Sequence, residues 1–170
     1  AELAVAQQLT DRVVGAVSEP VLAALLLGKS AEASERGVEL ELADEAAVDD
    51  ALIGDRAIAP RDAVTVLGNL IDNAVDAALQ GGGSPPRVRV TLRGQDGELL
   101  MRVADNGAGV TDTETVFRRG WSTKTTSGHG LGLALVGQVV RRYGGSVDVH
   151  NDQDGGGAVF TVRLPAGVRS

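Results

Sequence analysis

The stretch NLIDNAVDAA, residues 69–78, lies in the middle of a long helical pattern. The predicted helix begins at Pro60, which suits a first helical turn because proline lacks the N–H that would go unbonded there. The segment GGGSPP, residues 81–86, ends it. Apolar residues recur at helical spacing and form a wide stripe: Ala63, Val66, Leu67, Leu70, Ile71, Ala74, Val75 and Ala78. This helix is therefore predicted to pack a broad face against a core.

Two asparagines interrupt that helix at mid-length. Asn69 and Asn73 are four residues apart, so they lie one above the other, with Asp76 close to the same line. Asparagine is a poor mid-helix residue because its amide competes for backbone hydrogen bonds. A solvated polar stripe would explain the pair. Amide oxygens that ligate Mg²⁺, or hold its water shell, are the functional explanation, and the helix alone does not favour it over the solvated stripe.

The segments around this helix predict further helices and several hairpins. Helical spacing is present at residues 1–18, 21–36 and about 130–143. Alternation with period two predicts strands in the following segments: 38–42, 87–94, 97–106, GGSVDVHND and GGAVFTVRLP. Because hairpins predominate, the predicted fold class is α+β, with a layer of helices on a largely antiparallel sheet.

Composition narrows the function classes. A chain of 170 residues suits one domain with a small appendage. The formal net charge of −7 argues against nucleic-acid binding, and the absence of cysteine excludes disulfides and thiolate metal sites. The chain has no signal peptide and no apolar run long enough to span a bilayer. Since it lacks an initiator Met, we expect a fragment of a longer protein, whose other parts could still tether it to a membrane.

The segment VADNGAGV, residues 103–110, is a predicted strand end followed by glycines. Asp105 at such an end can accept a hydrogen bond from an exocyclic amine such as that of adenine. Gly107 and Gly109 lack Cβ atoms, so the backbone there can approach a flat ring closely. An ordinary turn after a strand fits this segment as well.

The segment RRGWSTKTTSGHGLGLALV, residues 118–136, places Gly128, Gly130 and Gly132 directly before a predicted helix. The N-terminus of a helix presents free N–H groups and the positive end of the helix dipole, which suit a phosphate. The spacing of these glycines matches neither the dinucleotide fingerprint nor the Walker loop.

Lys124 lies just upstream of those glycines. Its flexible ammonium could reach a terminal phosphate if the loop folded over a nucleotide, although a lone loop lysine is more often only solvated. Residues 111–128 are rich in Thr, Ser and Gly, so we expect a lid that is poorly ordered without ligand.

Taken together, the three motifs resemble the N, G1 and G2 boxes of the ATP-binding superfamily that includes gyrase, the heat-shock chaperone, mismatch-repair ATPases and sensor histidine kinases. The resemblance extends from about residue 37 to 166. The segment VFRRGWSTKTTSGHGLGLALV is similar to the lid of the citrate- and dicarboxylate-sensing histidine kinases. The resemblance implies a Bergerat-type, two-layer α/β sandwich with helices on one face of a mixed, mostly antiparallel sheet.

The resemblance also implies roles for individual residues. Asn73 would ligate Mg²⁺, and Asn69 would position the metal and the phosphates, directly or through water. These two, with Lys124, would form the catalytic set, while Asp105 would read the adenine amine and Gly109 would give the ring room. The remaining implied ATP contacts are Gly107, Val110, Ser122, Thr123, Lys124, Gly128, His129, Gly130, Leu131 and Gly132. One departure is Ala158, where relatives often carry Ser or Thr to support the adenine site.

Asn69 bears on the choice between kinase and ATPase. Hydrolysing relatives hold a Glu at this position to activate water, and an amide cannot act as that base. The γ-phosphate would then be kept for another acceptor. His129 and His150 are the only histidines and neither lies in an acceptor context, whereas residues 1–18 look like the tail of the second helix of a dimerisation hairpin.

We therefore expect residues 19–170 to be the Mg-ATP-binding catalytic domain of a sensor histidine kinase. Its partners would be the dimerisation and phosphoacceptor domain of the same kinase and a response regulator. The full-length protein would be a membrane-tethered homodimer with this part in the cytoplasm. The alternatives are a Ser/Thr kinase of the anti-sigma-factor type, a stand-alone ATPase, and a degenerate domain that only scaffolds a complex. Asn69 opposes the ATPase, and Asn73, Asp105 and Lys124 oppose the degenerate domain.

Overall fold

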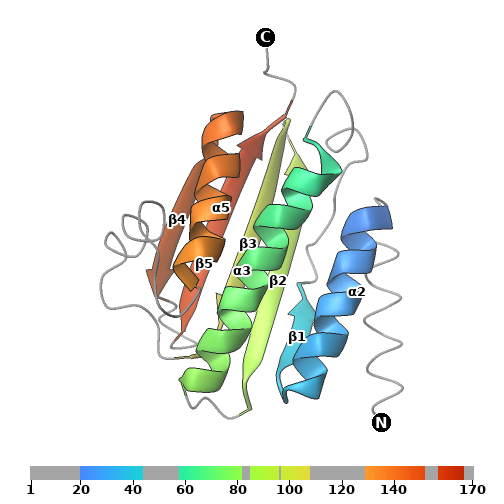
Figure 1. The fold of residues 1–170 in the computed structure, drawn as a ribbon, viewed down its shortest axis with the longest axis vertical. Helices are drawn as coiled ribbons and strands as arrows, with labels where there is room; N and C mark the ends of the chain where they lie inside the picture. The colour runs from blue at the N-terminus through green and yellow to red at the C-terminus, as the bar shows by residue number, and fades with distance from the viewer. Residues whose placement is uncertain are drawn as a thin grey trace.

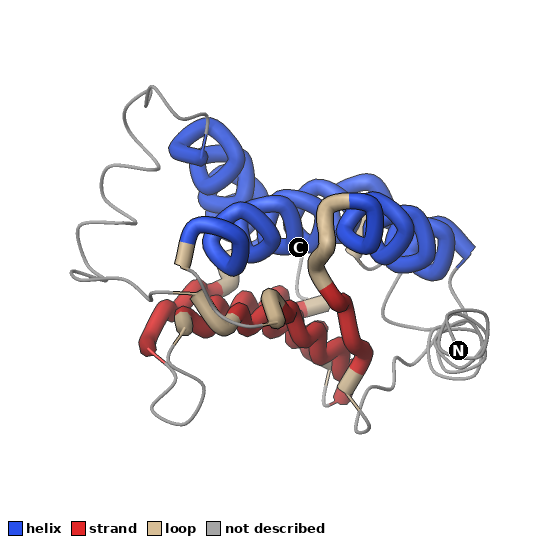
Figure 2. The backbone as a smooth tube through the Cα atoms, turned by 90° about the horizontal axis from the view of Figure 1, so that it is seen from below, coloured by secondary structure: helices blue, strands red, loops and turns tan. Residues whose placement is uncertain are grey.

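The computed structural model describes residues 20–43, 58–81, 85–95, 97–107, 129–151 and 157–166. In this part of the chain a layer of helices covers one face of a five-stranded sheet (Figures 1 and 2). The elements are α2 Pro20–Glu35, β1 Glu39–Leu42, α3 Pro60–Gln80, β2 Arg87–Gln95, β3 Glu98–Asp105, α5 His129–Tyr143, β4 Ser146–Asn151 and β5 Ala158–Pro165. The predicted two-layer α+β class is confirmed. The predicted helix over residues 1–18 and the predicted lid over 111–128 lie outside the described residues.

The sheet is mixed and mostly antiparallel, as predicted. Its strand order is β1-β2-β3-β5-β4. Only the β1–β2 pair is parallel, and the other three pairs are antiparallel. β2 and β3 form a tight hairpin that pairs Gln95 with Glu98, and Gly97 in its turn has a φ of 73°, which glycine adopts without a steric cost.

α3 is the middle helix of the helix layer, between α2 and α5 (Figure 1). All eight residues of its predicted apolar stripe are buried. α3 packs on β2 and β3 as well as on α2 and α5, and the two strands contribute these buried apolar residues: Val88, Val90, Leu92, Leu99, Met101 and Val103. α3 is therefore fixed over the centre of the sheet, and its polar residues lie on the sides that face the neighbouring helices.

The order of the last two strands determines what lies beside Asp105. β5 pairs with β3, so the chain places β4 at the sheet edge and then returns inward. The antiparallel register pairs Ala104 with Val159, which puts the start of β5 next to the end of β3. No helix of the described residues is long and apolar enough to cross a membrane.

Candidate functional site

α3 and α5 run antiparallel, and the residues in contact differ between the two ends of this helix pair. At one end Asp62 of α3 contacts Arg142 and Tyr143 near the C-terminus of α5. At the other end Asn69 of α3 lies against Gly132 in the first part of α5. The N-terminus of α5 therefore points along α3 toward its C-terminal half, where Asn73 lies.

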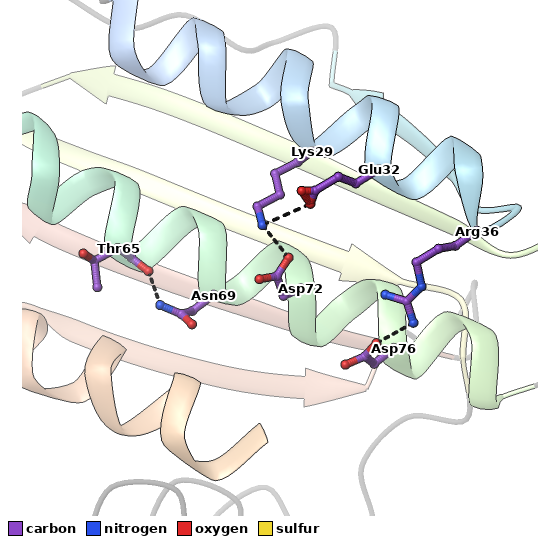
Figure 3. Close-up of polar contacts among 7 residues, drawn as sticks. All are labelled: Lys29, Glu32, Arg36, Thr65, Asn69, Asp72 and Asp76. Atoms are coloured by element: carbon purple, nitrogen blue, oxygen red, sulfur yellow. Dashed lines mark hydrogen bonds and ion pairs between the residues drawn. The ribbon is translucent and has the colours of Figure 1, made fainter. Parts of the chain in front are cut away.

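Asn69 is oriented by its own helix. Its Nδ2 donates a hydrogen bond to the Thr65 carbonyl oxygen at 2.6 Å (Figure 3). Its Oδ1 faces α5 so closely that a Cβ added to Gly132 would lie 2.9 Å from that oxygen. Glycine at position 132 is thus what lets the first turn of α5, with its unbonded N–H groups, approach the Asn69 amide.

Asn73 lies one helical turn beyond Asn69 and is half-buried. One turn further, the carbonyl of Ala77 is in close contact with Gly107, where an added Cβ would overlap the carbonyl oxygen. The turn that carries Asn73 is therefore bracketed by the two glycine-bearing segments. Within the described residues, no hydrogen bond engages the Asn73 amide.

Asp105 ends β3 and is only 4% exposed. Its Oδ1 accepts hydrogen bonds from the backbone N–H groups of Gly107, at 2.8 Å, and Ala158, at 3.4 Å. Its Oδ2 is buried and has no partner among the described residues. Burial raises the pKa of this carboxyl above 3.8, and the two backbone hydrogen bonds oppose that rise.

An unbonded, buried carboxylate oxygen costs free energy, on the order of 1–3 kcal/mol or more for a charged group. Such an atom needs an explanation, and a missing hydrogen-bond donor is the direct one. Asp105 Oδ2 could therefore accept a hydrogen bond from a ligand amine. The predicted assignment of Asp105 to a purine amine requires this geometry.

Two contacts of Asp105 were not anticipated from the sequence. A Cβ on Gly157 would overlap the Asp105 carbonyl, so only glycine lets β5 begin this close to β3. The Ala158 position has no hydroxyl, yet its backbone N–H bonds the Asp105 carboxylate. The GGG segment ahead of β5 was the available signal, but the contact is made by the backbone and leaves no side-chain pattern.

The structure brings five of the predicted site residues to one end of the α3–α5 contact: Asn69, Asn73, Asp105, Gly107 and Gly132. His129, Gly130 and Leu131 lie in the first turn of α5. Other predicted site residues lie outside the described part of the chain: Gly109, Val110, Ser122, Thr123, Lys124 and Gly128. Asp76, predicted near the amide line, accepts a hydrogen bond at 2.8 Å from Arg36, which directly follows α2 (Figure 3).

The described donors and acceptors suit a ligand with an amine at one end and negative charge at the other. The amine fits the free oxygen of Asp105, and the negative charge fits the N-terminus of α5. Asn73 lies on α3 between the contacts with Gly132 and Gly107, and hard amide oxygens are suitable Mg²⁺ ligands. This arrangement fits a purine nucleotide with its metal.

Comparison with known proteins identifies the family of the chain. Residues 58–168 match the family described as histidine kinase-, DNA gyrase B-, and HSP90-like ATPase. The chain is 34% identical over 161 residues to a probable C4-dicarboxylate sensor kinase of Halalkalibacterium halodurans, covering 94% of this chain and 30% of that protein. It is 31% identical over 161 residues to the sensor histidine kinase CitA of Klebsiella pneumoniae, covering 94% and 29%. The chain thus spans about 30% of the length of these curated relatives.

Among solved structures, full-length ShkA in complex with AMPPNP has the same fold, with a TM-score of 0.64 and 26% identity. The match covers 89% of this chain and 30% of that one. The family predicted from the three motifs is confirmed: the chain belongs to the histidine kinase-, DNA gyrase B-, and HSP90-like ATPase family, and its relatives include a probable C4-dicarboxylate sensor kinase and the sensor histidine kinase CitA.

Proposed function

We propose that residues 19–170 are the catalytic domain of a sensor histidine kinase, which binds Mg-ATP and transfers the γ-phosphate to a histidine outside this chain. The observation that carries this proposal is the buried Oδ2 of Asp105, which has no described partner and lies beside the Gly107 contact with α3. It provides the acceptor that the amine of adenine requires. Guanine carries a carbonyl oxygen at the same ring position, so the site would prefer ATP to GTP.

The residues of the proposed site divide the nucleotide among them. Asp105 accepts the amine hydrogen, and Gly107 with Gly109 leaves space for the ring. The N–H groups of the first turn of α5, together with Lys124, donate to the phosphates. Asn73 holds Mg²⁺ through its amide oxygen, assisted by Asn69. When bound, Mg²⁺ neutralises the charge that develops on the β- and γ-phosphoryl oxygens.

Asn69 supports transfer over hydrolysis. Its amide is neutral and its nitrogen is bonded to the Thr65 carbonyl, so it cannot accept a proton from water. Phosphoryl transfer depends mainly on positioning and on charge neutralisation, so a domain without a base can hold ATP until a partner brings the nucleophile. We propose that the partners are a dimerisation domain with the acceptor histidine, of which residues 1–18 are the tail, and a response regulator. The whole protein would be a membrane-tethered homodimer with this domain in the cytoplasm.

Calorimetric titration tests the binding step. We expect the chain to bind ATP in magnesium buffer, to bind GTP at least about tenfold more weakly, and to bind ATP less tightly in EDTA. Well-folded protein that binds no adenine nucleotide would refute the proposal. A Lys124→Gln variant should lose affinity for ATP and retain affinity for adenosine, because the role proposed for Lys124 involves only the phosphates.

Transfer is tested with γ-labelled ATP and the full-length kinase from which this sequence derives. We expect the label on a histidine, as an acid-labile phosphohistidine, and then its transfer to a response regulator. Replacement of the acceptor histidine by Gln is the control and should abolish labelling. Acid-stable label on serine would favour the anti-sigma-factor type of kinase, and steady release of phosphate by this chain alone would favour an ATPase.

A further inference from the structure

Two ion pairs tie α2 to α3, and they differ in their position relative to the candidate site. Lys29 Nζ lies 2.8 Å from Asp72 Oδ1, and Arg36 Nη2 lies 2.8 Å from Asp76 Oδ1 (Figure 3). Lys29 also pairs with Glu32 at 3.5 Å. Both pairs join α3 to the α2 region at the same distance, Lys29 from within α2 and Arg36 from the turn directly after it, so each serves as a comparison for the other.

The side of α3 that faces α2 is marked by Gly68. A Cβ added there would lie 3.7 Å from Leu25 and 3.9 Å from the Lys29 side chain. At 3.6 residues per turn, Asp72 is rotated only about 40° from Gly68, whereas Asp76 is rotated about 80° from it, toward the amides. The Lys29–Asp72 pair therefore belongs to the helix interface.

The Arg36–Asp76 pair belongs to the amide side of α3. Asp76 is one turn beyond Asn73, about 60° from it around the helix and about 20° from the direction of Asn69. Figure 3 shows the Arg36 side chain extending from the end of α2 toward α3, where it reaches this carboxylate. A cation from the turn after α2 is thus brought to the half of α3 that carries the proposed metal ligand.

Exposure also separates the two cations. The Lys29 side chain is 18% exposed and is engaged by two carboxylates, while the Arg36 side chain is 51% exposed. A guanidinium has five N–H donors, and within the described residues only Nη2 of Arg36 is used. Its remaining donors are open to a ligand, in the planar geometry that suits phosphate oxygens.

Charge gives the arrangement a purpose. The negative charge of Asp76 lies on the same side of α3 as Asn69, so it would repel a triphosphate held by Asn73 and by the N-terminus of α5 unless a cation offsets it. We propose that Arg36 is a further nucleotide-binding residue, which neutralises Asp76 and donates its free N–H groups to the polyphosphate. Asp76 is then a positioning residue that holds the guanidinium in place. This inference rests on the proposed function, because it requires ATP in the same site.

The test compares Arg36→Gln with Lys29→Gln in the 170-residue chain. Each variant loses one cation from the same helix pair. We expect Arg36→Gln to weaken Mg-ATP binding about tenfold and to leave adenosine binding unchanged, because adenosine has no phosphates. Lys29→Gln should bind both ligands like the wild type. Equal losses in both variants, or an equal loss for ATP and adenosine, would show a general effect on the helix interface and overturn the inference.

A double variant separates the phosphate contact from simple neutralisation of Asp76. If Arg36 donates to phosphate, Arg36→Gln with Asp76→Asn still binds ATP weakly, because the donors are absent. If that double variant regains wild-type affinity, repulsion by Asp76 explains the whole effect and the proposed contact is wrong. Thermal unfolding of each variant checks that it is folded. Wild-type protein that binds neither ATP nor adenosine would instead refute the proposed function, a result distinct from any difference among variants.

Discussion

Asp62 and Asp105 are both buried aspartates, 6% and 4% exposed, but their carboxylates have different surroundings. Asp62 Oδ2 accepts a hydrogen bond from the Tyr143 hydroxyl at 2.6 Å, and both of its oxygens accept from Arg142 Nη1 at 3.2 Å. The Tyr143 hydroxyl in turn accepts a bond from the Ala59 N–H at 3.0 Å. Asp105 has backbone donors on Oδ1 only, and its Oδ2 is left without a described partner.

The two aspartates illustrate two reasons for burying a carboxylate: one joins parts of the fold, and the other could bind a ligand. Asp62 has partners for both oxygens and joins the start of α3 to the end of α5, so its burial stabilises the helix pair. Asp105 is held rigidly by one oxygen while the other is unsatisfied, which lowers stability unless a ligand supplies a donor. A ligand amine that donates a hydrogen bond to Oδ2 would remove this free-energy cost, and its binding would be strengthened by that amount.

Gly157→Ala is expected to have the largest effect, because it breaks the Asp105 side of the comparison. The new Cβ would overlap the Asp105 carbonyl, so the start of β5 must move away from β3. We expect a loss of about 3 kcal/mol in the free energy of unfolding and no measurable ATP binding. Gly28→Ala is the control: no atom lies within 4 Å of its added Cβ, and it should slightly stabilise α2. Denaturant unfolding and ATP titration measure both, and a Gly157→Ala protein that binds ATP normally would contradict the assigned contact.

Asp105→Asn and Asp62→Asn sharpen the comparison, because their effects should have opposite signs. Asp105→Asn removes a buried charge, so the nucleotide-free protein should be more stable by about 1 kcal/mol, while ATP binds at least about tenfold more weakly. Asp62→Asn disrupts a satisfied cluster, so it should lower the free energy of unfolding by about 1–3 kcal/mol. ATP affinity should change little in Asp62→Asn protein that remains folded. Losses of stability in both variants would remove the distinction between the two aspartates.

Tyr143→Phe tests the Asp62 cluster without altering its charge. The ring still packs against the core, but the Ala59 N–H loses its acceptor and Asp62 Oδ2 loses its shortest bond. We expect a loss of about 1–2 kcal/mol in the free energy of unfolding, with ATP affinity within about twofold of the wild type. A large loss of ATP affinity in folded Tyr143→Phe protein would mean that the Asp62 cluster also positions the candidate nucleotide site.

How much of the fold and the candidate site could be predicted from sequence depends on whether a feature is set by a local pattern or by a partner far along the chain. α3 and the β2–β3 hairpin were predicted because their apolar periods are local. The parallel β1–β2 pair and the inner position of β5 depend on partners far along the chain, so alternation within each strand does not specify them. Asn73 and Asp105 became candidates through the resemblance of three motifs taken together, because each motif alone also fits a solvated stripe or an ordinary turn. Gly157 and Arg36 were missed because Gly157 acts by lacking a Cβ and Arg36 reaches α3 from a segment 40 residues earlier in the chain.

The pH dependence of ligand binding should give the smallest effect, and it isolates the Asp105 carboxyl. Burial raises its pKa above the usual 3.8, so as the pH falls it takes up a proton before an ordinary aspartate does. A protonated carboxyl is a poorer acceptor for the adenine amine, so affinity should fall with pH through this raised pKa. Adenosine is the ligand of choice because it has no phosphates that titrate in the same range. Asp105→Asn should show a flat profile.

Stability of the nucleotide-free protein should depend on pH in the opposite direction. The folded state holds the Asp105 proton more tightly than the unfolded chain does, so this group contributes favourably at and below pH 3.8. That contribution is lost as the pH rises through the raised pKa, which is the same window in which adenosine affinity increases. If Asp105 is both buried and bound to the adenine amine, stability should fall and adenosine affinity should rise as the pH increases. Parallel trends, or a wild-type profile as flat as that of Asp105→Asn, would mean that Asp105 is not the group that reads the amine.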